Sequence, residues 1–267
     1  MLLHVLFFIP KKHLEAKKMS IYINKPLFPQ GVITGANFEQ EWMLPAWFDS
    51  YKKYNDSPIL FIDFGMSESA KRWCKKRGEL ITLTPQKTPL KQSIAQHIPD
   101  AILEKRAVWF QKPKALLSTL FKKSIWVDVD VLFFGTVQPI FDLIKDLNAL
   151  AMRKEIAIRA DSERSLNLVP QKATSYNTGV VAYMWGCLPI AQWCENLDIC
   201  CKSHLGDQDS FSTFLYKSGA PVILLPEYMH QIHPEEKSHR SIIYHFASSA
   251  GKNAFLEAKT VSSLPTE

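Results

Sequence analysis

The sequence predicts one α/β domain built on a mixed, mostly parallel sheet flanked by helices. The chain has 267 residues, 46% of them hydrophobic, which is enough to bury one large core. After Met19, short apolar runs alternate with amphipathic runs, a pattern typical of repeated βα units and therefore of parallel strands. No internal repeat, low-complexity tract or linker divides the chain. We therefore expect a single domain at residues 20–267, preceded by an extension at residues 1–19.

The first part of the chain is predicted to form a βαβαβ unit. Strands are expected at residues 31–36, 58–65 and 79–84, with a helix at residues 67–77 closed by Gly78. The run at residues 37–40, NFEQ, resembles a capping box that opens the other helix, and Pro45 should kink this helix. Its predicted inner face consists of Leu44, Trp47, Phe48 and Tyr51.

The later elements follow from the same reasoning. Residues 86–111 favour helical pieces around Pro89 and Pro99, and Pro113 should start a helix that runs through Phe121. The apolar run at residues 125–135 should then form a strand. The remaining predictions, in chain order, are a helix at 139–147, a strand at 150–154, a polar loop at 160–175, a strand at 179–185, helices at 189–203 and 207–217, and strands at 221–225 and 242–245.

Charge and cysteine content restrict the class of partner and the compartment. The net charge is +6, and four lysines against one glutamate in residues 1–18 supply half of it, which is too little to indicate nucleic-acid binding. The surplus suits an anionic substrate such as a phosphate ester, and equally a solvated surface. The five cysteines lack C-x₂-C pairs, so a reducing compartment is expected. Cys187, Cys194 and Cys201 recur every seven residues, which favours packing in a helix core over metal binding.

The apolar N-terminal run, MLLHVLFFIP, is shorter than a bilayer span, and its lysines follow the apolar residues instead of preceding them. We therefore expect no transmembrane segment and a cytoplasmic protein, with Met19 as a candidate start of translation. The competing interpretation is a weak interfacial segment with a basic tail, which would make the protein membrane-peripheral.

Two carboxylates interrupt the apolar run IWVDVDVLFFG at residues 125–135. In a regular strand, Asp128 and Asp130 would lie on the same face, about 7 Å apart. Hard oxygen ligands at this spacing suit Mg²⁺ or Mn²⁺. Solvated carboxylates at a strand end are the alternative, but Trp126, Phe133 and Phe134 make the flanks apolar, and ionised groups there need compensation. The run therefore favours a metal site.

Five segments, together with their order along the chain, resemble the metal-dependent glycosyltransferases of the GT-A fold, especially glycogenin, galactinol synthase and the lipopolysaccharide galactosyltransferases. WVDVDVLFFG resembles the D-x-D strand, and GVITGANF resembles the first nucleotide-binding strand and turn. WFQKPKALL resembles the helix that brings a basic side chain to the donor, SYNTGVVAY the strand beside the acceptor, and GDQDSF the start of a D-Q-D helix. The resemblance spans about residues 31–256 and implies a Rossmann-like GT-A domain.

The resemblance also implies a metal and donor site. It assigns Asp128 and Asp130 to Mn²⁺ (or Mg²⁺) bound to the diphosphate of a UDP-sugar. In IIYHFASSAGKNAF, His245 would complete the metal shell and Lys252 would neutralise the diphosphate, although the spacing is longer than in the family and Asn253-Ala254 replaces Pro-Trp. A buried structural histidine and a surface lysine are the respective alternatives.

Three further assignments follow from the resemblance. Lys112 aligns with the basic residue that covers the diphosphate and is preferred over Lys114. The nucleoside would contact Thr34, Ala36 and Asn37. The structural alternative is that these residues only end a strand and cap a helix. Around the transferred sugar and acceptor the resemblance places Asn177, Asp207, Gln208 and Asp209.

These four residues also have structural alternatives. Asn177 could form a turn before Gly179, and residues 207–209 could form a helix N-cap with an acidic first turn. Three more histidines, His230, His233 and His239, lie in a polar segment without HExxH spacing and are expected at the surface.

Together these features predict a metal-dependent glycosyltransferase that moves a hexose from a nucleotide-diphosphate sugar to a hydroxyl acceptor on a saccharide, lipid or protein. Retention of anomeric configuration is implied by the resemblance, as is the lack of a dedicated base. Residues 86–111 and 156–175 are expected to shape the acceptor site. Two alternatives remain, a haloacid-dehalogenase-like phosphatase, since D-V-D-V-L approximates its nucleophile loop, and an inactive sugar-nucleotide binding module.

Overall fold

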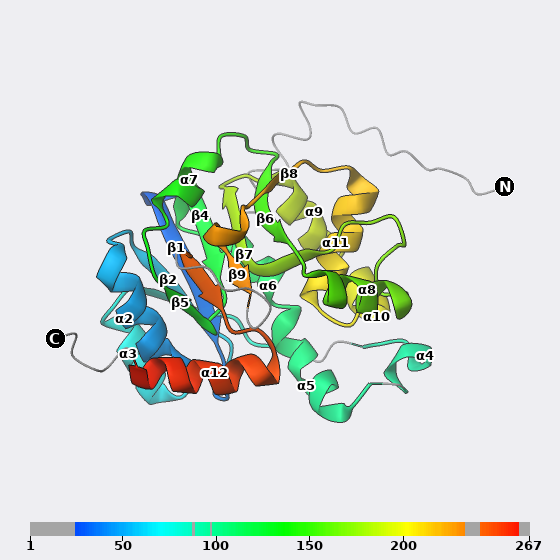
Figure 1. Cartoon of the computed structure of the whole chain (residues 1–267), viewed down its shortest axis with the longest axis horizontal. Helices are drawn as coiled ribbons and strands as arrows, with labels where there is room; N and C mark the ends of the chain where they lie inside the picture. Colours follow the sequence, from blue (N-terminus) through cyan, green and yellow to red (C-terminus); the bar gives the residue numbers. More distant parts are fainter. Residues whose placement is uncertain (1–24, 87–88, 97, 233–240, 262–267) are drawn as a thin grey trace.

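The computed structural model describes residues 25–86, 89–96, 98–232 and 241–261. Its centre is a seven-stranded sheet with the strand order β3-β2-β1-β4-β7-β6-β8, flanked by helices (Figure 1). These strands are β1 (Phe28–Ala36), β2 (Ile59–Asp63), β3 (Glu79–Thr82), β4 (Phe121–Val127), β6 (Leu150–Lys154), β7 (Tyr176–Met184) and β8 (Val222–Leu224). Only β7 runs antiparallel to its neighbours within this sheet. The predicted mixed, mostly parallel α/β fold is therefore confirmed.

A second, three-stranded sheet corrects the interpretation of residues 125–135 as one strand. The chain leaves the large sheet after Val127, and β5 (Val131–Phe133) pairs antiparallel with β10 (Ile243–His245). The third member of this sheet is β9 (Gln231–Ile232), which the sequence did not indicate. Asp128 and Asp130 therefore lie in the connection between two sheets and not on one regular strand.

The helix that follows β1 begins later than predicted. A 3-10 turn, η1 (Glu41–Met43), leads into α2 (Leu44–Tyr54), and no side chain caps either element. The expected capping box is therefore wrong. Pro45 lies in the first turn of α2, where its missing N–H removes no helical hydrogen bond, so it does not kink the helix. By contrast, Ser67 caps α3 (Glu68–Lys75) by accepting a hydrogen bond from the Ala70 amide.

Several later helices differ from their predicted bounds. Residues 160–175 were expected to be a loop, but α8 spans Ala157–Ser165. The expected helix at 189–203 is broken at Asn196 into α9 (Leu188–Glu195) and α10 (Leu197–Ser203). The segment from 113 to 121 is helical only within α6 (Lys112–Leu117), because Phe121 already begins β4. The other helices are α4 (Gln92–Ala95), α5 (Asp100–Trp109), α7 (Gln138–Leu143), α11 (Asp207–Ser218), the turn η2 (Glu227–Met229) and α12 (Ser248–Val261), which was not predicted.

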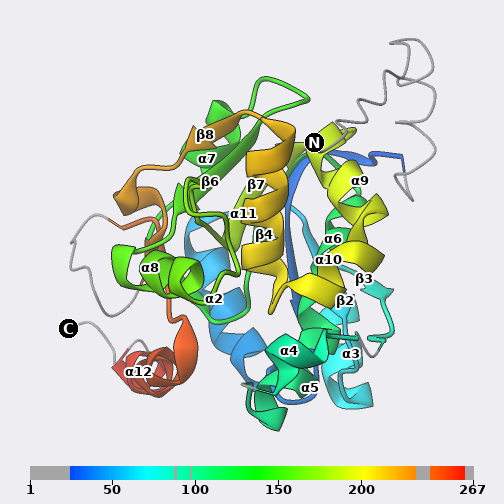
Figure 2. The ribbon, with the colours of Figure 1, turned by 90° about the vertical axis from the view of Figure 1, so that its right-hand side faces the viewer.

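Alternating side chains of the central strands fill two cores. On β1, Val32 belongs to the core under α2 and α7, whereas Ile33 belongs to the opposite core under α6, α9 and α11 (Figure 2). In the second core, the ring of Trp193 stacks on that of Phe211 at 4.1 Å between centroids. Covering the sheet on both faces explains why its strands are apolar runs and not alternating patterns.

The five cysteines are unbridged, and four of them are buried. Burial raises the pKa of the Cys187 thiol to about 12, which suits a packing role. In the ranges that the structure describes, no helix combines the length and the apolar character needed to cross a membrane. Both the extension at residues 1–19 and two of the surface-assigned histidines, His233 and His239, lie outside those ranges.

Candidate metal and donor site

Backbone hydrogen bonds hold the two aspartates at the edge where the two sheets meet. The amide of Asp128 donates to the carbonyl of Gly179 on β7 (2.8 Å), and the carbonyl of Asp130 accepts from the amide of Phe246 after β10 (2.9 Å). The indole Nε1 of Trp47 donates to the carbonyl of Asp128 at 3.1 Å. The connection between β4 and β5 is therefore fixed on both sides, although it belongs to neither sheet.

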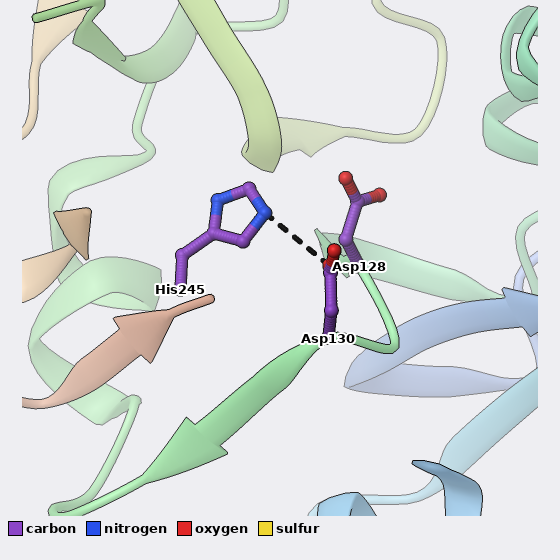
Figure 3. A group of neighbouring side chains, drawn as sticks. All are labelled: Asp128, Asp130 and His245. Carbon is purple, nitrogen blue, oxygen red and sulfur yellow. Dashed lines mark ion pairs between the residues drawn. The ribbon is translucent and has the colours of Figure 1, made fainter. Parts of the chain in front are cut away.

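Asp128, Asp130 and His245 converge at this edge (Figure 3). One ligand atom from each residue can be chosen so that all three lie within 4.8 Å of one another. His245 Nε2 lies 3.3 Å from Asp130 Oδ1, and the indole N–H of Trp126 donates to Asp128 Oδ1 at 2.6 Å. Two carboxylate oxygens and one imidazole nitrogen form a donor set that suits a divalent first-row cation or Mg²⁺. The residues thus fit the metal that the resemblance implies.

The charges of the three residues are interdependent. Burial raises the pKa of Asp128 although Lys112 opposes the shift. Burial would also raise the pKa of Asp130, but the adjacent His245 outweighs it and holds that pKa below its usual range. In the same way, Asp130 overcomes the effect of burial on His245 and raises the pKa of the imidazole. Positive charge next to Asp128 and Asp130, such as that of a protonated His245, is therefore stabilised by two carboxylates.

Lys112 links Asp128 to α11. Its Nζ lies 2.6 Å from Asp207 Oδ2 and 3.1 Å from Asp128 Oδ1, and it donates to the carbonyl of Thr178 at 3.2 Å. The lysine is only 7% exposed. Burial alone would disfavour the ammonium, but Asp128 and Asp207 outweigh it and raise the pKa of Lys112. Lys112 is therefore a permanent cation inside the site. Lys114 does not line the cavity described below.

The glycine of the N-T-G-V segment makes room for the histidine. A Cβ at position 179 would collide with the ring of His245 and would lie 2.9 Å from Asn177 Oδ1. The same Asn177 oxygen accepts the Gly179 amide at 2.9 Å. Close approach of β7 to β10 therefore requires glycine here.

His230 was expected at the surface, and this is wrong. The residue is fully buried, and its Nε2 lies 3.2 Å from Nδ1 of His245. Burial lowers the pKa of His230 well below its usual value, so its imidazole is neutral. When Nε2 of His245 acts as a ligand, Nδ1 carries the proton and needs an acceptor, which His230 Nε2 can supply. The sequence offered no signal for this contact, because β9 was not predicted.

A cavity of about 460 Å³ opens in front of these groups, a size typical of small-molecule sites. Most of the predicted site residues line it: Asn37, Lys112, Asp128, Asp130, Asn177, Asp207, Gln208, His245 and Lys252. Lys105 and Trp109 of α5 and Arg159 of α8 also contribute. The two segments expected to shape the acceptor site therefore both reach the cavity. In Figure 2, α8 lies to the left of the lower end of α11 and α5 lies below it.

Three predicted residues do not reach the cavity. Thr34 and Ala36 on β1 are fully buried, whereas Gly35 between them is part of the cavity wall. Asp209 instead caps α11, since its carboxylate accepts the amides of Leu205 and Gly206, each at 2.7 Å. The side chains of Thr34, Ala36 and Asp209 are therefore too buried in this structure to make the substrate contacts that were predicted for them.

Two carboxylates beside Gln208 were not foreseen. Glu155, which follows β6, accepts hydrogen bonds from the side-chain amides of Asn177 and Gln208, each at 2.8 Å. Glu163 on α8 accepts a second hydrogen bond from Gln208 at 2.7 Å. These contacts join residues 22 to 53 positions apart, so no local motif reveals them.

The fold is shared with known glycosyltransferases. No protein-family model and no curated protein matches the chain. Among solved structures, the galactosyltransferase LgtC, in complex with donor and acceptor sugar analogs, has a TM-score of 0.58 at 15% identity and covers 89% of this chain and 98% of its own. The bifunctional glycosyltransferase WbbM has a TM-score of 0.60 at 14% identity, covering 88% of this chain and 50% of its own.

Mouse xyloside xylosyltransferase 1 is a third example, with a TM-score of 0.52 at 11% identity over 83% of this chain and 97% of its own. At these identities, the likeness establishes the fold. It is the GT-A fold that the resemblance implied.

Proposed function

We propose that the protein is a metal-dependent glycosyltransferase that moves a hexose from a UDP-sugar to a hydroxyl acceptor with retention of configuration. The observation that carries this proposal is the cluster of Asp128, Asp130 and His245, which lies in one cavity with Lys112 and Lys252 on a glycosyltransferase fold. Two carboxylates, an imidazole and two lysines form a site for a divalent cation together with a diphosphate.

The donor would bind along the edge of the sheet. Lys252 on α12 lines the same cavity as Asp128 and Asp130, so it lies near enough to interact with a diphosphate on the metal. Asn37 also lines the cavity, and its buried Oδ1 has no hydrogen-bond partner among the described residues. An N–H group of the nucleobase is a suitable partner for this oxygen.

Transfer requires stabilisation of charge at two positions. When bound, Mn²⁺ or Mg²⁺ supplies positive charge where the departing diphosphate becomes negative. Lys112 adds a fixed ammonium at the same position, held between Asp128 and Asp207. On the sugar side, Asp207 and Gln208 orient the hexose and favour the positive charge that develops at the anomeric carbon. Retention is consistent with an acceptor hydroxyl that is deprotonated by the leaving diphosphate.

Asp130→Asn tests the proposal, because it keeps the size of the side chain and removes one charge from the metal site. The variant should fold, bind Mn²⁺ and UDP much more weakly, and lose about 10²-fold or more of its donor hydrolysis or transfer rate. Calorimetry with UDP in Mn²⁺ and in chelator, melting temperature and UDP-sugar turnover are the measurements. Asp56→Asn, a fully exposed carboxylate paired with Lys52, is the control.

Unchanged Mn²⁺ affinity together with unchanged turnover would contradict the proposal. Normal metal and UDP binding by the wild type without turnover of any UDP-sugar, with or without candidate acceptors, would instead support an inactive binding module. The phosphatase alternative is not favoured, since the structural neighbours are glycosyltransferases.

A further inference from the structure

The side chain of Gln208 is held between two carboxylates. Its Nε2 lies 2.8 Å from Glu155 Oε2 and 2.7 Å from Glu163 Oε1. A primary amide nitrogen has two protons, and an ionised carboxylate can only accept. Burial raises the pKa of Glu163, but Glu155 also accepts two other N–H groups and so identifies its Gln208 partner as the nitrogen. Both amide protons are therefore used. The atom between the two carboxylates is therefore the nitrogen. The carbonyl oxygen Oε1 is directed away from both carboxylates, on a side chain that lines the cavity. Within the described ranges, this oxygen has no hydrogen-bond partner.

Glu155 is itself fixed and cannot turn to follow Gln208. Its Oε1 accepts the amide of Ile156 at 2.8 Å, and its Oε2 accepts the amide of Asn177 at 2.8 Å. Asn177 is fixed in turn, because its own oxygen accepts the Gly179 amide. Glu155 therefore belongs to a rigid network of hydrogen bonds that begins at Asn177 and Gly179 of β7.

Glu163 supplies the other side and has a simpler role. It lies on α8, is partly buried, and is not among the residues that line the cavity, whereas Glu155 is. Any effect of Glu163 on a bound sugar therefore acts through Gln208. Without it, Glu155 would still hold one amide proton, but the terminal torsion of a glutamine has two broad, nearly equivalent orientations. The amide would then be held by one hydrogen bond instead of two, so its carbonyl oxygen would be oriented less strictly toward the cavity.

We propose that Glu163 is a positioning residue for sugar transfer, which together with Glu155 orients the amide of Gln208 so that its carbonyl oxygen, and not its nitrogen, faces the transferred hexose. This inference rests on the proposed function. A carbonyl oxygen carries partial negative charge and stabilises an electron-deficient anomeric carbon, whereas an N–H₂ group at the same place destabilises it. Orientation of this amide therefore affects the transition state more than the bound donor.

Kinetics of two variants test the proposal. Glu163→Ala should lower kcat about tenfold or more, while KM for the UDP-sugar and the dissociation constant of UDP in Mn²⁺ stay within about twofold. Glu163→Gln should retain part of the rate, because its carbonyl can still accept the proton of Gln208. Asp161→Asn is the matched control, since this carboxylate lies on the same helix but is exposed and paired with Arg164. It should leave kcat and melting temperature unchanged.

The orientation itself can be observed without turnover. In ¹H–¹⁵N spectra, both side-chain amide protons of Gln208, assigned by their loss in Gln208→Leu, should exchange slowly with solvent in the wild type. In Glu163→Ala or, if that variant does not fold, in Glu163→Gln, one of them should become less protected. Rapid exchange of both protons in the wild type would overturn the proposal. So would an unchanged kcat in a folded Glu163 variant whose amide protection has changed.

Failure of the proposed function looks different. In that case the wild type turns over no UDP-sugar although both Gln208 protons are protected, and the inference fails with the function. If the wild type is active and the Glu163 variants match it, only the inference fails.

Discussion

Replacing Lys112 with methionine removes a buried ammonium that contacts both Asp128 and Asp207. At an effective dielectric constant of about 20, separations of 3.1 Å and 2.6 Å correspond to gross attractions of about 5 and 6 kcal/mol. Desolvation of the three charges offsets much of this. Removing one partner of a buried ion pair nevertheless costs about 3–5 kcal/mol, because an uncompensated charge stays buried.

The variant should therefore be less stable by about 3–5 kcal/mol in chelator, which corresponds to a melting temperature lower by roughly 10 °C for a domain of this size. Mn²⁺ should recover part of the loss, since binding to Asp128 replaces the missing charge there and binding to the native state stabilises it. It should not recover all of the loss, because Asp207 is outside the cluster of metal ligands. The difference between wild type and variant is thus expected to shrink in Mn²⁺.

Urea unfolding at neutral pH, in chelator and in saturating Mn²⁺, measures these quantities. Lys114→Met is the control, because it lies on the same short helix α6 but is not a cavity residue, and it should change stability by less than about 0.5 kcal/mol. A loss below about 1 kcal/mol for Lys112→Met, equal in chelator and in Mn²⁺, would refute the reasoning.

Three further predictions concern the surroundings of the site. Gly179→Ala places a methyl group against the ring of His245, so Mn²⁺ affinity in calorimetry should fall at least about tenfold with retained circular dichroism; unchanged affinity would contradict this packing. Trp193→Ala should lower the free energy of unfolding in urea by about 3–5 kcal/mol, since the side chain is fully buried against Phe211, and a loss under about 1 kcal/mol would show that the second core adapts. Burial alone would raise the pKa of Asp63, but hydrogen bonds from two backbone amides and a threonine outweigh it and lower that pKa. The ionised Asp63 carboxylate therefore stabilises the fold fully above the unfolded pKa near 4. This stabilisation is lost as the pH falls through the lower pKa of the folded state. Asp63→Asn should flatten this acid dependence in urea unfolding from pH 5 to pH 3, and an unchanged slope would exclude Asp63 as its source.

The central sheet and much of the site could be predicted because their signals are local. Strand β6 was predicted with its observed bounds, Leu150–Lys154, since an apolar run between polar ends has few alternatives. Asp128 and Asp130 were identified as candidate ligands because ionised groups in an apolar run need a partner. The resemblance supplied His245, which local spacing does not connect to them.

The remaining features depend on contacts between distant segments. The break at Asp128 follows from pairing of β5 with β10, more than a hundred residues later. Burial of His230 follows from the two-residue strand β9, which is too short for a periodic signal. Glu163 lies in a segment whose polar composition indicated a loop, and its partner is 45 residues away. Tertiary pairing, which single-sequence patterns do not encode, decides each of these.

The small sheet of β5, β10 and β9 also sets the order in which the site can form during synthesis. A nascent chain that has released residues 28–232 already contains Lys112 and both aspartates, yet it lacks the strand that pairs with β5 and carries His245. Lys252, on the helix after that strand, arrives later still. The strands of the central sheet are therefore all synthesised before the cation site can be complete, and the last segments of the described chain supply two of the residues of its proposed chemistry.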